Sequence, residues 1–473
     1  MVKRIFLTGA TGLMGWQGLK ELLKFPDKYR VVVLARKSDK NVKKLAPISG
    51  KIDVVWGDLL NYDDVLRGVS GADYVLHLGA LVSPAADYYP EKTLHVNVNA
   101  AKNVVNAVLA QDKPENVKVV YIGSVAQTSD RQAPAHWGRI GDPVSPSQFD
   151  YYGVSKIVAE RIFADSDLPK WVSLRQSGVL YPKIVKNFDP IMFHVPLRGC
   201  LEWTTIEDSG RLLEHLCRDE VPDSFWNHFY NISSGPQYRM TNYEFERRLL
   251  DAAYCPPPEK IFNTNWFVLK NFHGHYFLDS DKLDEILHFR EYLSLDEYFK
   301  RLKHSLPWYF KLAKIVPPSI IKAVLGRLAN KEDKGTQYWI KHNMEKEIRA
   351  YYGSVDRYKA IPDWDEFDLS ELPSADESVH VSHGYDESKP LSELSLSELR
   401  SAAKFRGGTL VSESYSGNPE EKLLWRCHKG HQFEATVKLV LEGGHWCPEC
   451  ITPEYDVDDL AEHSEFFAQI HNR

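Results

Sequence analysis

A glycine-rich turn near the N-terminus constrains the fold of this chain most strongly. A β-branched run at residues 3–7 is followed directly by Thr8-Gly9-Ala10-Thr11-Gly12-Leu13-Met14-Gly15, which opens an amphipathic helix. Glycines allow a tight turn and close approach of a ligand to the backbone, and the free N–H groups of a helix start attract an anion. A plain strand-to-helix turn also has this pattern, but we expect a dinucleotide here. Its expected contacts are Gly9, Thr11, Gly12, Leu13, Met14 and Gly15.

Short β-branched runs alternate with helical patterns through the first 180 residues. This alternation predicts an α/β fold, a Rossmann-like doubly wound parallel sheet. The predicted strands are residues 3–7, 29–34, 54–56, 74–78, 117–122 and 172–174. A seventh strand at residues 228–232 is expected to return to the same sheet after an insertion.

Changes in composition divide the chain into five segments. Residues 1–180 are expected to form the cofactor-binding domain, with the return strand at 228–232 added. Residues 181–362 are rich in aromatic side chains and predict a smaller, helix-rich substrate region. Residues 363–390 are expected to form a flexible linker, because residues 363–388 carry nine acidic groups and no Lys or Arg. A small metal-binding unit at 391–452 and a tail at 453–473 complete the chain.

Tyr152 and Lys156 form the strongest catalytic pattern. They are four residues apart in a helical segment, so both side chains lie on one helix face. A free phenol has a pKa near 10, and a neighbouring ammonium lowers that pKa. We therefore expect Tyr152 to exchange a proton with a substrate hydroxyl or carbonyl group.

Several motifs together resemble the extended short-chain dehydrogenases/reductases, the NAD-dependent epimerase/dehydratase family. They are the Gly-x-x-Gly-x-x-Gly turn, Gly57-Asp58-Leu59, His77-Leu78-Gly79-Ala80 and Tyr152-Gly153-Val154-Ser155-Lys156, and the likeness covers about half of the chain. The resemblance implies that Asp58 and Leu59 lie near the adenine and that Leu78, Gly79 and Ala80 line the cofactor. It also implies that Tyr152 and Lys156 contact the cofactor, that Ser124 is the catalytic hydroxyl and that Asn97 shapes the site.

The end of the second predicted strand bears on the choice of cofactor. Ala35 occupies the place where an acidic residue would bind the ribose of NAD, and Arg36 follows it. A guanidinium can meet a 2′-phosphate in a bidentate pair, which favours NADP(H) over NAD(H). Arg36 could instead stack on the adenine or face solvent, and NAD would then serve equally well.

Departures from the family pattern narrow the reaction. Ser124 is followed by Val125-Ala126-Gln127, with no acidic residue immediately after it, which counts against dehydration. Gln176 follows Arg175 where sugar-nucleotide epimerases usually carry asparagine. We therefore expect an oxidoreductase that interconverts an alcohol and a ketone or aldehyde on a bulky, apolar small molecule. A nucleotide-sugar epimerase is the alternative enzyme, and a cofactor-binding scaffold is the non-enzymatic one. Trp203, Thr204 and Asp208 resemble the family's segment near the substrate.

Cysteine and histidine crowd one region near the C-terminus. Cys427, His431, Cys447 and Cys450 supply the sulfur and nitrogen donors of a tetrahedral zinc site, with His428 and His445 as alternates. Four protein ligands leave no position for a reactive water, so we expect a structural Zn²⁺. The flanking residues resemble small treble-clef or ribbon-like zinc modules.

Composition and charge exclude some partners and leave others open. A net charge of −7 provides no basic field for nucleic acid, and there is neither a signal-peptide pattern nor a stretch long enough to span a membrane. We expect a cytoplasmic enzyme with a small-molecule substrate, and a homodimer by default. Residues 308–328 mix apolar and basic side chains and predict either a packed helical pair or a membrane-surface segment.

Overall fold

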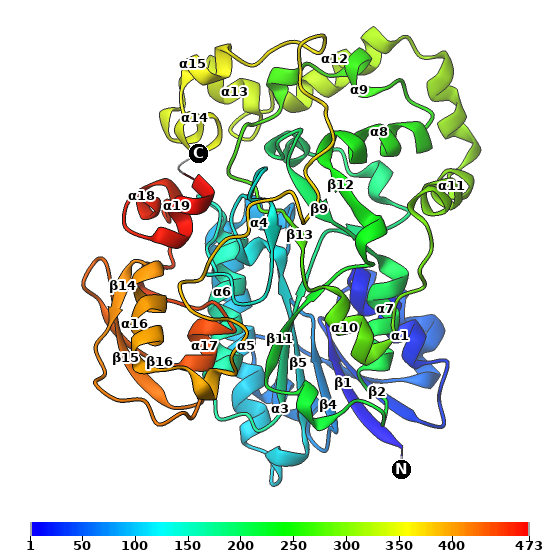
Figure 1. Cartoon of the computed structure of the whole chain (residues 1–473). Coiled ribbons are helices and arrows are strands. Elements are labelled where there is room, and N and C mark those ends of the chain that lie inside the picture. The colour runs from blue at the N-terminus through cyan, green and yellow to red at the C-terminus, as the bar shows by residue number, and fades with distance from the viewer. Residues whose placement is uncertain (1, 472–473) are drawn as a thin grey trace.

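The computed structural model describes residues 2–471, and a parallel sheet lies at its centre (Figure 1). The strand order is β11-β7-β5-β4-β1-β2-β3, with every pair of neighbours parallel. The strands are Lys3–Thr8 (β1), Tyr29–Ala35 (β2), Asp53–Trp56 (β3), Tyr74–His77 (β4), Lys118–Ser124 (β5), Trp171–Gln176 (β7) and His228–Ile232 (β11). The predicted doubly wound α/β fold and its return strand are therefore confirmed.

Helices cover both faces of this sheet, which explains why its strands are continuous apolar runs. On one face lie α1 (Leu13–Leu22), α7 (Ile206–His215) and α10 (Asp281–Leu287), and their leucines share a core with β1, β2 and β7. On the other face lie α3 (Tyr62–Val69), α5 (Pro90–Leu109) and α6 (Tyr151–Ala164). The short helices α2 (Asp39–Leu45) and α4 (Ala85–Tyr88) follow β2 and β4.

A helix-rich region lies beyond the carboxyl ends of the strands, at the top of Figure 1. Its helices are α8 (Asn242–Ala252), α9 (Pro258–Ile261), α11 (Leu295–Ser305), α12 (Pro318–Ala329), α13 (Thr336–Lys341), α14 (Glu345–Tyr352) and α15 (Val355–Lys359). Short strand pairs join this region to the sheet: β6 (Trp137–Gly138) with β13 (Tyr276–Phe277), β8 (Val179–Leu180) with β10 (Thr204–Thr205), and β9 (Cys200–Glu202) with β12 (Arg239–Thr241). No described helix is both long and apolar enough to cross a bilayer.

The C-terminal unit packs beside α6 (Figure 1). It contains the antiparallel strands β14 (Gly408–Leu410), β15 (Lys422–Cys427) and β16 (Gln432–Thr436), and the helices α16 (Leu396–Phe405) and α17 (Val437–Leu441). Trp425 and Leu439 belong to the same apolar core as Phe163 of α6. This unit is therefore continuous with the enzyme-like body. Helices α18 (Val457–Ala461) and α19 (Glu465–His471) follow it.

The acidic stretch at residues 363–390 forms no helix or strand, yet it lies against the body of the protein. His383 is fully buried, and its Nε2 lies 2.7 Å from the Asp142 carboxylate. Arg131 also pairs with Asp142, at 2.7 Å. The composition of this stretch is typical of a flexible linker, but the His383–Asp142 contact and the Arg139–Glu387 ion pair fix parts of it to the body of the protein.

Candidate active site

The glycine-rich turn between β1 and α1 is too crowded for larger residues. Gly9 has a φ of +71°, and a Cβ on Gly15 would lie 2.3 Å from the Gly9 carbonyl oxygen. A Cβ on Gly9 would lie 2.9 Å from the Gly79 nitrogen, beyond β4. No side chain caps α1, so its first N–H groups remain available to an anion. This cradle fits the pyrophosphate of a dinucleotide.

Thr8 joins the turn to the neighbouring strand. Its hydroxyl oxygen accepts hydrogen bonds from the N–H groups of Leu78 and Gly79, at 3.1 and 3.0 Å, and lies 3.0 Å from Nδ1 of His77. Burial and the charge of Lys156 lower the pKa of His77 to about 3. Thr8 and the neutral His77 were not predicted as site residues. The sequence did offer a signal for them, because each ends a strand and the two strands are neighbours in the sheet.

The other predicted cofactor residues surround the same edge of the sheet. Arg36 directly follows β2, is exposed, and has no side-chain partner among the described residues. Asp58 follows β3 and accepts a hydrogen bond from the backbone of the loop, while Leu59 packs against Gly79. The Lys44 ammonium donates to the Thr11 carbonyl oxygen at 2.9 Å and adds a positive charge that sequence reasoning missed.

Tyr152, Ser124 and Lys156 lie together at the carboxyl end of β5. Tyr152 lies in the first turn of α6, where the Asp150 side chain accepts a hydrogen bond from the Gly153 N–H at 2.8 Å. Burial raises the pKa of Tyr152 to about 12, while a hydrogen bond with Ser124 opposes the rise and Asp150 adds to it. Tyr152 therefore carries its phenolic proton at neutral pH.

Lys156 lies close to Tyr152 and contacts the backbone of β5. Its ammonium lies 6.0 Å from the centre of the Tyr152 ring and donates to the Ile122 carbonyl oxygen at 2.6 Å. Burial lowers the pKa of Lys156 to about 8. Because burial dominates the pKa of Tyr152 in this structure, the expected lowering of that pKa by Lys156 is not observed.

Asn97 braces the site. This buried α5 residue accepts a hydrogen bond from the Leu81 N–H at 2.7 Å and donates to the Leu81 carbonyl oxygen at 3.0 Å. Its amide also donates to the Ser155 hydroxyl at 2.8 Å. Asn97 therefore fixes the loop after β4 to the helix that carries Tyr152.

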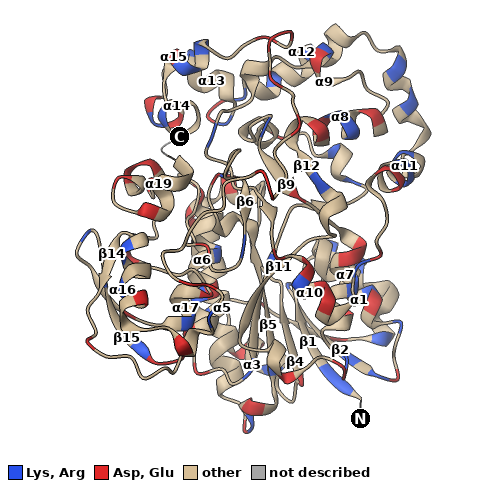
Figure 2. Ribbon diagram, viewed as in Figure 1, with Lys and Arg blue, Asp and Glu red and all other residues tan. Residues whose placement is uncertain are grey.

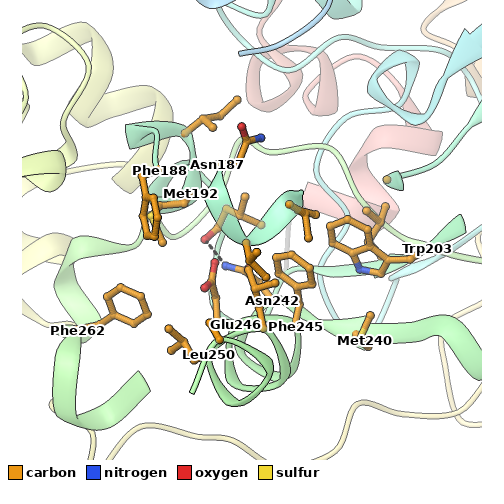
Figure 3. A pocket seen from close by; sticks show the side chains of 18 of the residues that line it. Asn187, Phe188, Met192, Trp203, Met240, Asn242, Phe245, Glu246, Leu250 and Phe262 are labelled. Carbon is orange, nitrogen blue, oxygen red and sulfur yellow. Dashed lines mark hydrogen bonds between the residues drawn. The ribbon is translucent and has the colours of Figure 1, made fainter. Parts of the chain in front are cut away.

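A cavity of about 680 Å³ opens beside Ser124 and extends into the helix-rich region. Figure 3 shows its walls: Phe188, Met192 and Phe262 on one side, and Trp203, Met240 and Phe245 on the other. Among the described residues that line it there is no Lys or Arg. Of the predicted substrate segment only Trp203 lines the cavity, because Thr204 bonds to Ser177 and Asp208 pairs with Arg211.

Glu246 is the one carboxylate among the described residues of this wall. It lies on α8 beside Phe245 (Figure 3), is 4% exposed, and its side chain has no hydrogen-bond or ion-pair partner in the described chain. Burial raises the pKa of Glu246 to about 8, so the neutral acid predominates at pH 7. Sequence reasoning missed this residue because a polar position in an amphipathic helix gives no signal of its own.

The four predicted metal ligands lie together in the C-terminal unit, with donor atoms all within 4.8 Å of one another. The Cys427 and Cys450 sulfurs are 3.8 Å apart, and the sulfurs of Cys447 and Cys450 each lie 3.5 Å from Nδ1 of His431. The alternates lie elsewhere: the His428 ring stacks on His463, and His445 bonds to Glu160.

The C-terminal unit reaches the active-site helix through a buried polar network. Glu160 of α6 pairs with Arg175 at 2.6 Å and with His445 at 2.9 Å. Arg175 also donates to the Gly443 carbonyl oxygen at 2.5 Å. Burial would raise the pKa of Glu160, but the positive charge of Arg175 and the hydrogen bond from His445 hold it far below its ordinary value. The ionised Glu160 thus links α6 to the loop that precedes Cys447.

Comparisons with known proteins agree with this geometry. Residues 5–169 match the model of the NAD dependent epimerase/dehydratase family. UDP-glucose 4-epimerase of Rickettsia akari is 30% identical over 112 residues, 23% of this chain, and the chain spans about a third (33%) of that relative's length.

Two solved structures show the same fold. DesIV, a dTDP-glucose 4,6-dehydratase from Streptomyces venezuelae with NAD and TYD bound, is 19% identical with a TM-score of 0.52, covering 65% of this chain and 96% of its own. UDP-glucuronic acid 4-epimerase from Bacillus cereus, in complex with UDP-glucuronic acid and NAD, is 17% identical with a TM-score of 0.50, covering 65% and 99%. The N-terminal part of the chain thus matches the NAD dependent epimerase/dehydratase family, within a fold that extends over about two thirds of its length.

Proposed function

We propose that this protein is a nicotinamide-dinucleotide-dependent oxidoreductase that interconverts a hydroxyl and a carbonyl group on a bulky, apolar small molecule. The observation that carries this proposal is the cavity beside Ser124, whose walls are mainly aliphatic and aromatic and whose described lining has no Lys or Arg. Such a cavity favours an apolar ring system, since burying apolar surface stabilises the complex.

Each catalytic residue has a distinct role in this proposal. The protonated Tyr152 donates its proton to the substrate carbonyl oxygen during reduction, and Ser124 donates a hydrogen bond to the same oxygen. Bound in the glycine-lined cradle, the cofactor would supply or accept the hydride. Lys156 would turn toward the cofactor ribose, and Asn97 would hold the Leu81 loop in place.

We also propose that NADP(H) is preferred over NAD(H). Arg36 is exposed at the end of β2 without a side-chain partner among the described residues, and the preceding Ala35 offers no carboxylate to a ribose. The solved structures named above contain NAD, which makes the 2′-phosphate the point to test.

A nucleotide-sugar epimerase is the second candidate, because the named relatives act on nucleotide sugars. A nucleotide diphosphate needs cationic or N–H-rich partners, and the described cavity wall provides neither Lys nor Arg. The absence of cations in this wall therefore favours the apolar substrate.

The deciding experiment follows NADPH and NADH absorbance with polycyclic ketones and, separately, with UDP-sugars. We expect ketone reduction, and a loss of about 10²–10⁴-fold in kcat for Tyr152→Phe. Tyr151→Phe, which changes the neighbouring phenol, is the matched control and should keep its activity. Sugar inversion without net oxidation would instead establish the epimerase, and full activity of Tyr152→Phe would remove Tyr152 from the mechanism.

We further propose a structural Zn²⁺ on Cys427, His431, Cys447 and Cys450. Tetrahedral zinc with Zn–S bonds of about 2.3 Å separates two sulfur ligands by ~3.8 Å, and the sulfurs of Cys427 and Cys450 are 3.8 Å apart. Elemental analysis should find about one zinc per chain, in accord with one four-ligand site. A zinc content near zero in protein purified without chelators would refute the assignment.

A further inference from the structure

The segment from η9 (Trp308–Ile315) to α12 presents an unusual number of apolar side chains to solvent. Trp308 and Ile315 are 73% and 78% exposed, and Ile320 and Val324 are 54% and 53% exposed. We call this set the η9–α12 surface; its members are Trp308, Tyr309, Leu312, Ile315, Ile320 and Val324. Exposed apolar side chains gathered in one segment of this kind are typical of an interaction site.

Positive charges accompany this surface without balancing acids. No Asp or Glu occurs between residues 299 and 330. Lys311, Lys314, Lys322 and Arg327 form no ion pair with any described carboxylate. Figure 2 shows the basic segments along this edge of the molecule, to the right of α12. The partner of this surface should therefore be both apolar and negatively charged.

The same segment forms one wall of the substrate cavity. Tyr309, Ile320 and Val324 line the cavity and are also exposed, as is Phe188, which is 64% exposed. The Lys186 ammonium, near Phe188 in the chain, donates to the Tyr309 hydroxyl at 3.2 Å. The apolar surface and the cavity are therefore continuous.

From these observations we propose that the η9–α12 surface docks on an anionic lipid bilayer. Neither η9, with 8 residues, nor α12, with 12, is long enough to cross a membrane, so both would lie in the interface plane. Trp308 and Tyr309 suit the boundary between headgroups and acyl chains, and the lysines would meet lipid phosphates. Docking would place the cavity wall against the bilayer, from which an apolar ligand can enter.

Flotation of the full-length protein with vesicles tests the proposal. One set contains phosphatidylcholine only. The other also contains phosphatidylserine, at about 30% of the lipid, which gives the bilayer a negative surface that attracts basic side chains. We expect the protein to float with the anionic vesicles, and higher salt to weaken the association. Protein that stays unbound with both sets of vesicles would overturn the proposal.

Variants identify the surface that binds. Trp308→Ser combined with Ile315→Ser removes two apolar groups that do not line the cavity, and Lys311→Glu combined with Lys314→Glu reverses two charges. Each pair should reduce vesicle binding at least about tenfold. Val2→Ser, an equally simple change at an exposed valine outside the surface, is the control and should bind like the wild type.

Ketone reductase activity in detergent-free buffer, measured on the same variants, separates docking from catalysis. Loss of vesicle binding with unchanged turnover supports docking, whether or not the proposed substrate class is correct. The surface could instead bind a second copy of the chain, which sedimentation analysis would detect. A wild-type dimer that dissociates in Trp308→Ser/Ile315→Ser, together with no vesicle binding by the wild type, would overturn the proposal.

Discussion

Glu246 places a single carboxyl group in an apolar wall, where ionisation is costly. Burial raises its pKa to about 8, well above the ordinary value for glutamate, so the folded protein keeps the proton that the unfolded chain loses near pH 4.5. The folded state thus binds more protons between these two pH values. The contribution of Glu246 to the free energy of unfolding is therefore full below its ordinary pKa and is lost as the pH rises toward 8.

We predict that Glu246→Gln removes this dependence. The melting temperature of the wild type should fall as the pH increases from 5 to 8, since each unit of pKa difference is worth about 1.4 kcal/mol at most. The glutamine variant should show a flatter profile in the same buffers, measured by thermal denaturation. Parallel profiles for the two proteins would show that the Glu246 carboxyl group is solvated or paired.

Arg36 gives a second test of a single side chain. Arg36→Ala should weaken NADPH binding about tenfold, ~1.4 kcal/mol, because a charge-assisted pair with the 2′-phosphate is lost. NADH, which lacks that phosphate, should bind with unchanged affinity. Fluorescence titration of both cofactors measures the two constants, and an equal loss for both would mean that Arg36 stacks on the adenine.

At the level of elements, the β1–α1 turn depends on close backbone approaches at Gly9 and Gly15 that leave no room for a side chain. Gly15→Ala would bring a methyl group to 2.3 Å from the Gly9 carbonyl oxygen. We expect a destabilisation of about 1–3 kcal/mol and weaker cofactor binding, since the backbone must shift. Gly50→Ala is the matched control, because a Cβ there meets nothing within 4 Å. Chemical denaturation should therefore separate the two alanine variants.

The elements of the sheet could be predicted from the sequence because strands buried on both faces need apolar runs, and the runs ended at glycine or polar positions. The clustering of Cys427, His431, Cys447 and Cys450 could also be predicted, since these residues are close in the chain. Glu246 was not, because its surroundings come from α8, η5 (Pro190–His194) and α12, which are distant in sequence. The burial that raises the pKa of Tyr152 could not be predicted from the Tyr152 and Lys156 spacing, because burial depends on the whole fold.

For the whole molecule, the C-terminal unit and the active site share α6. One end of this helix carries Tyr152 and Lys156, and further along it Glu160 bonds to His445 and Arg161 donates to the Trp446 carbonyl oxygen at 2.7 Å. Sequence patterns could not predict this docking, because the partners are separated by 285 residues.

Loss of the proposed Zn²⁺ should therefore affect both the C-terminal unit and the candidate active site. His431→Ala, or chelation of the wild type, is expected to lower the melting temperature by roughly 5 °C or more, because metal binding contributes to folding. Turnover should fall as well, since α6 loses its outer support. His428→Ala, next to the cluster but outside it, should change little. A chelated protein with unchanged melting temperature and turnover would show that the metal supports neither part.

The shared core beside α6 has a consequence for attempts to produce a smaller version of this protein. A chain shortened before residue 391 would leave Glu160 and Arg175 without His445 and the Gly443 carbonyl, and would uncover Phe229, which packs against His445. Residues 1–390 are thus not a complete folded body, and we expect a chain trimmed to them to be insoluble unless that face were redesigned.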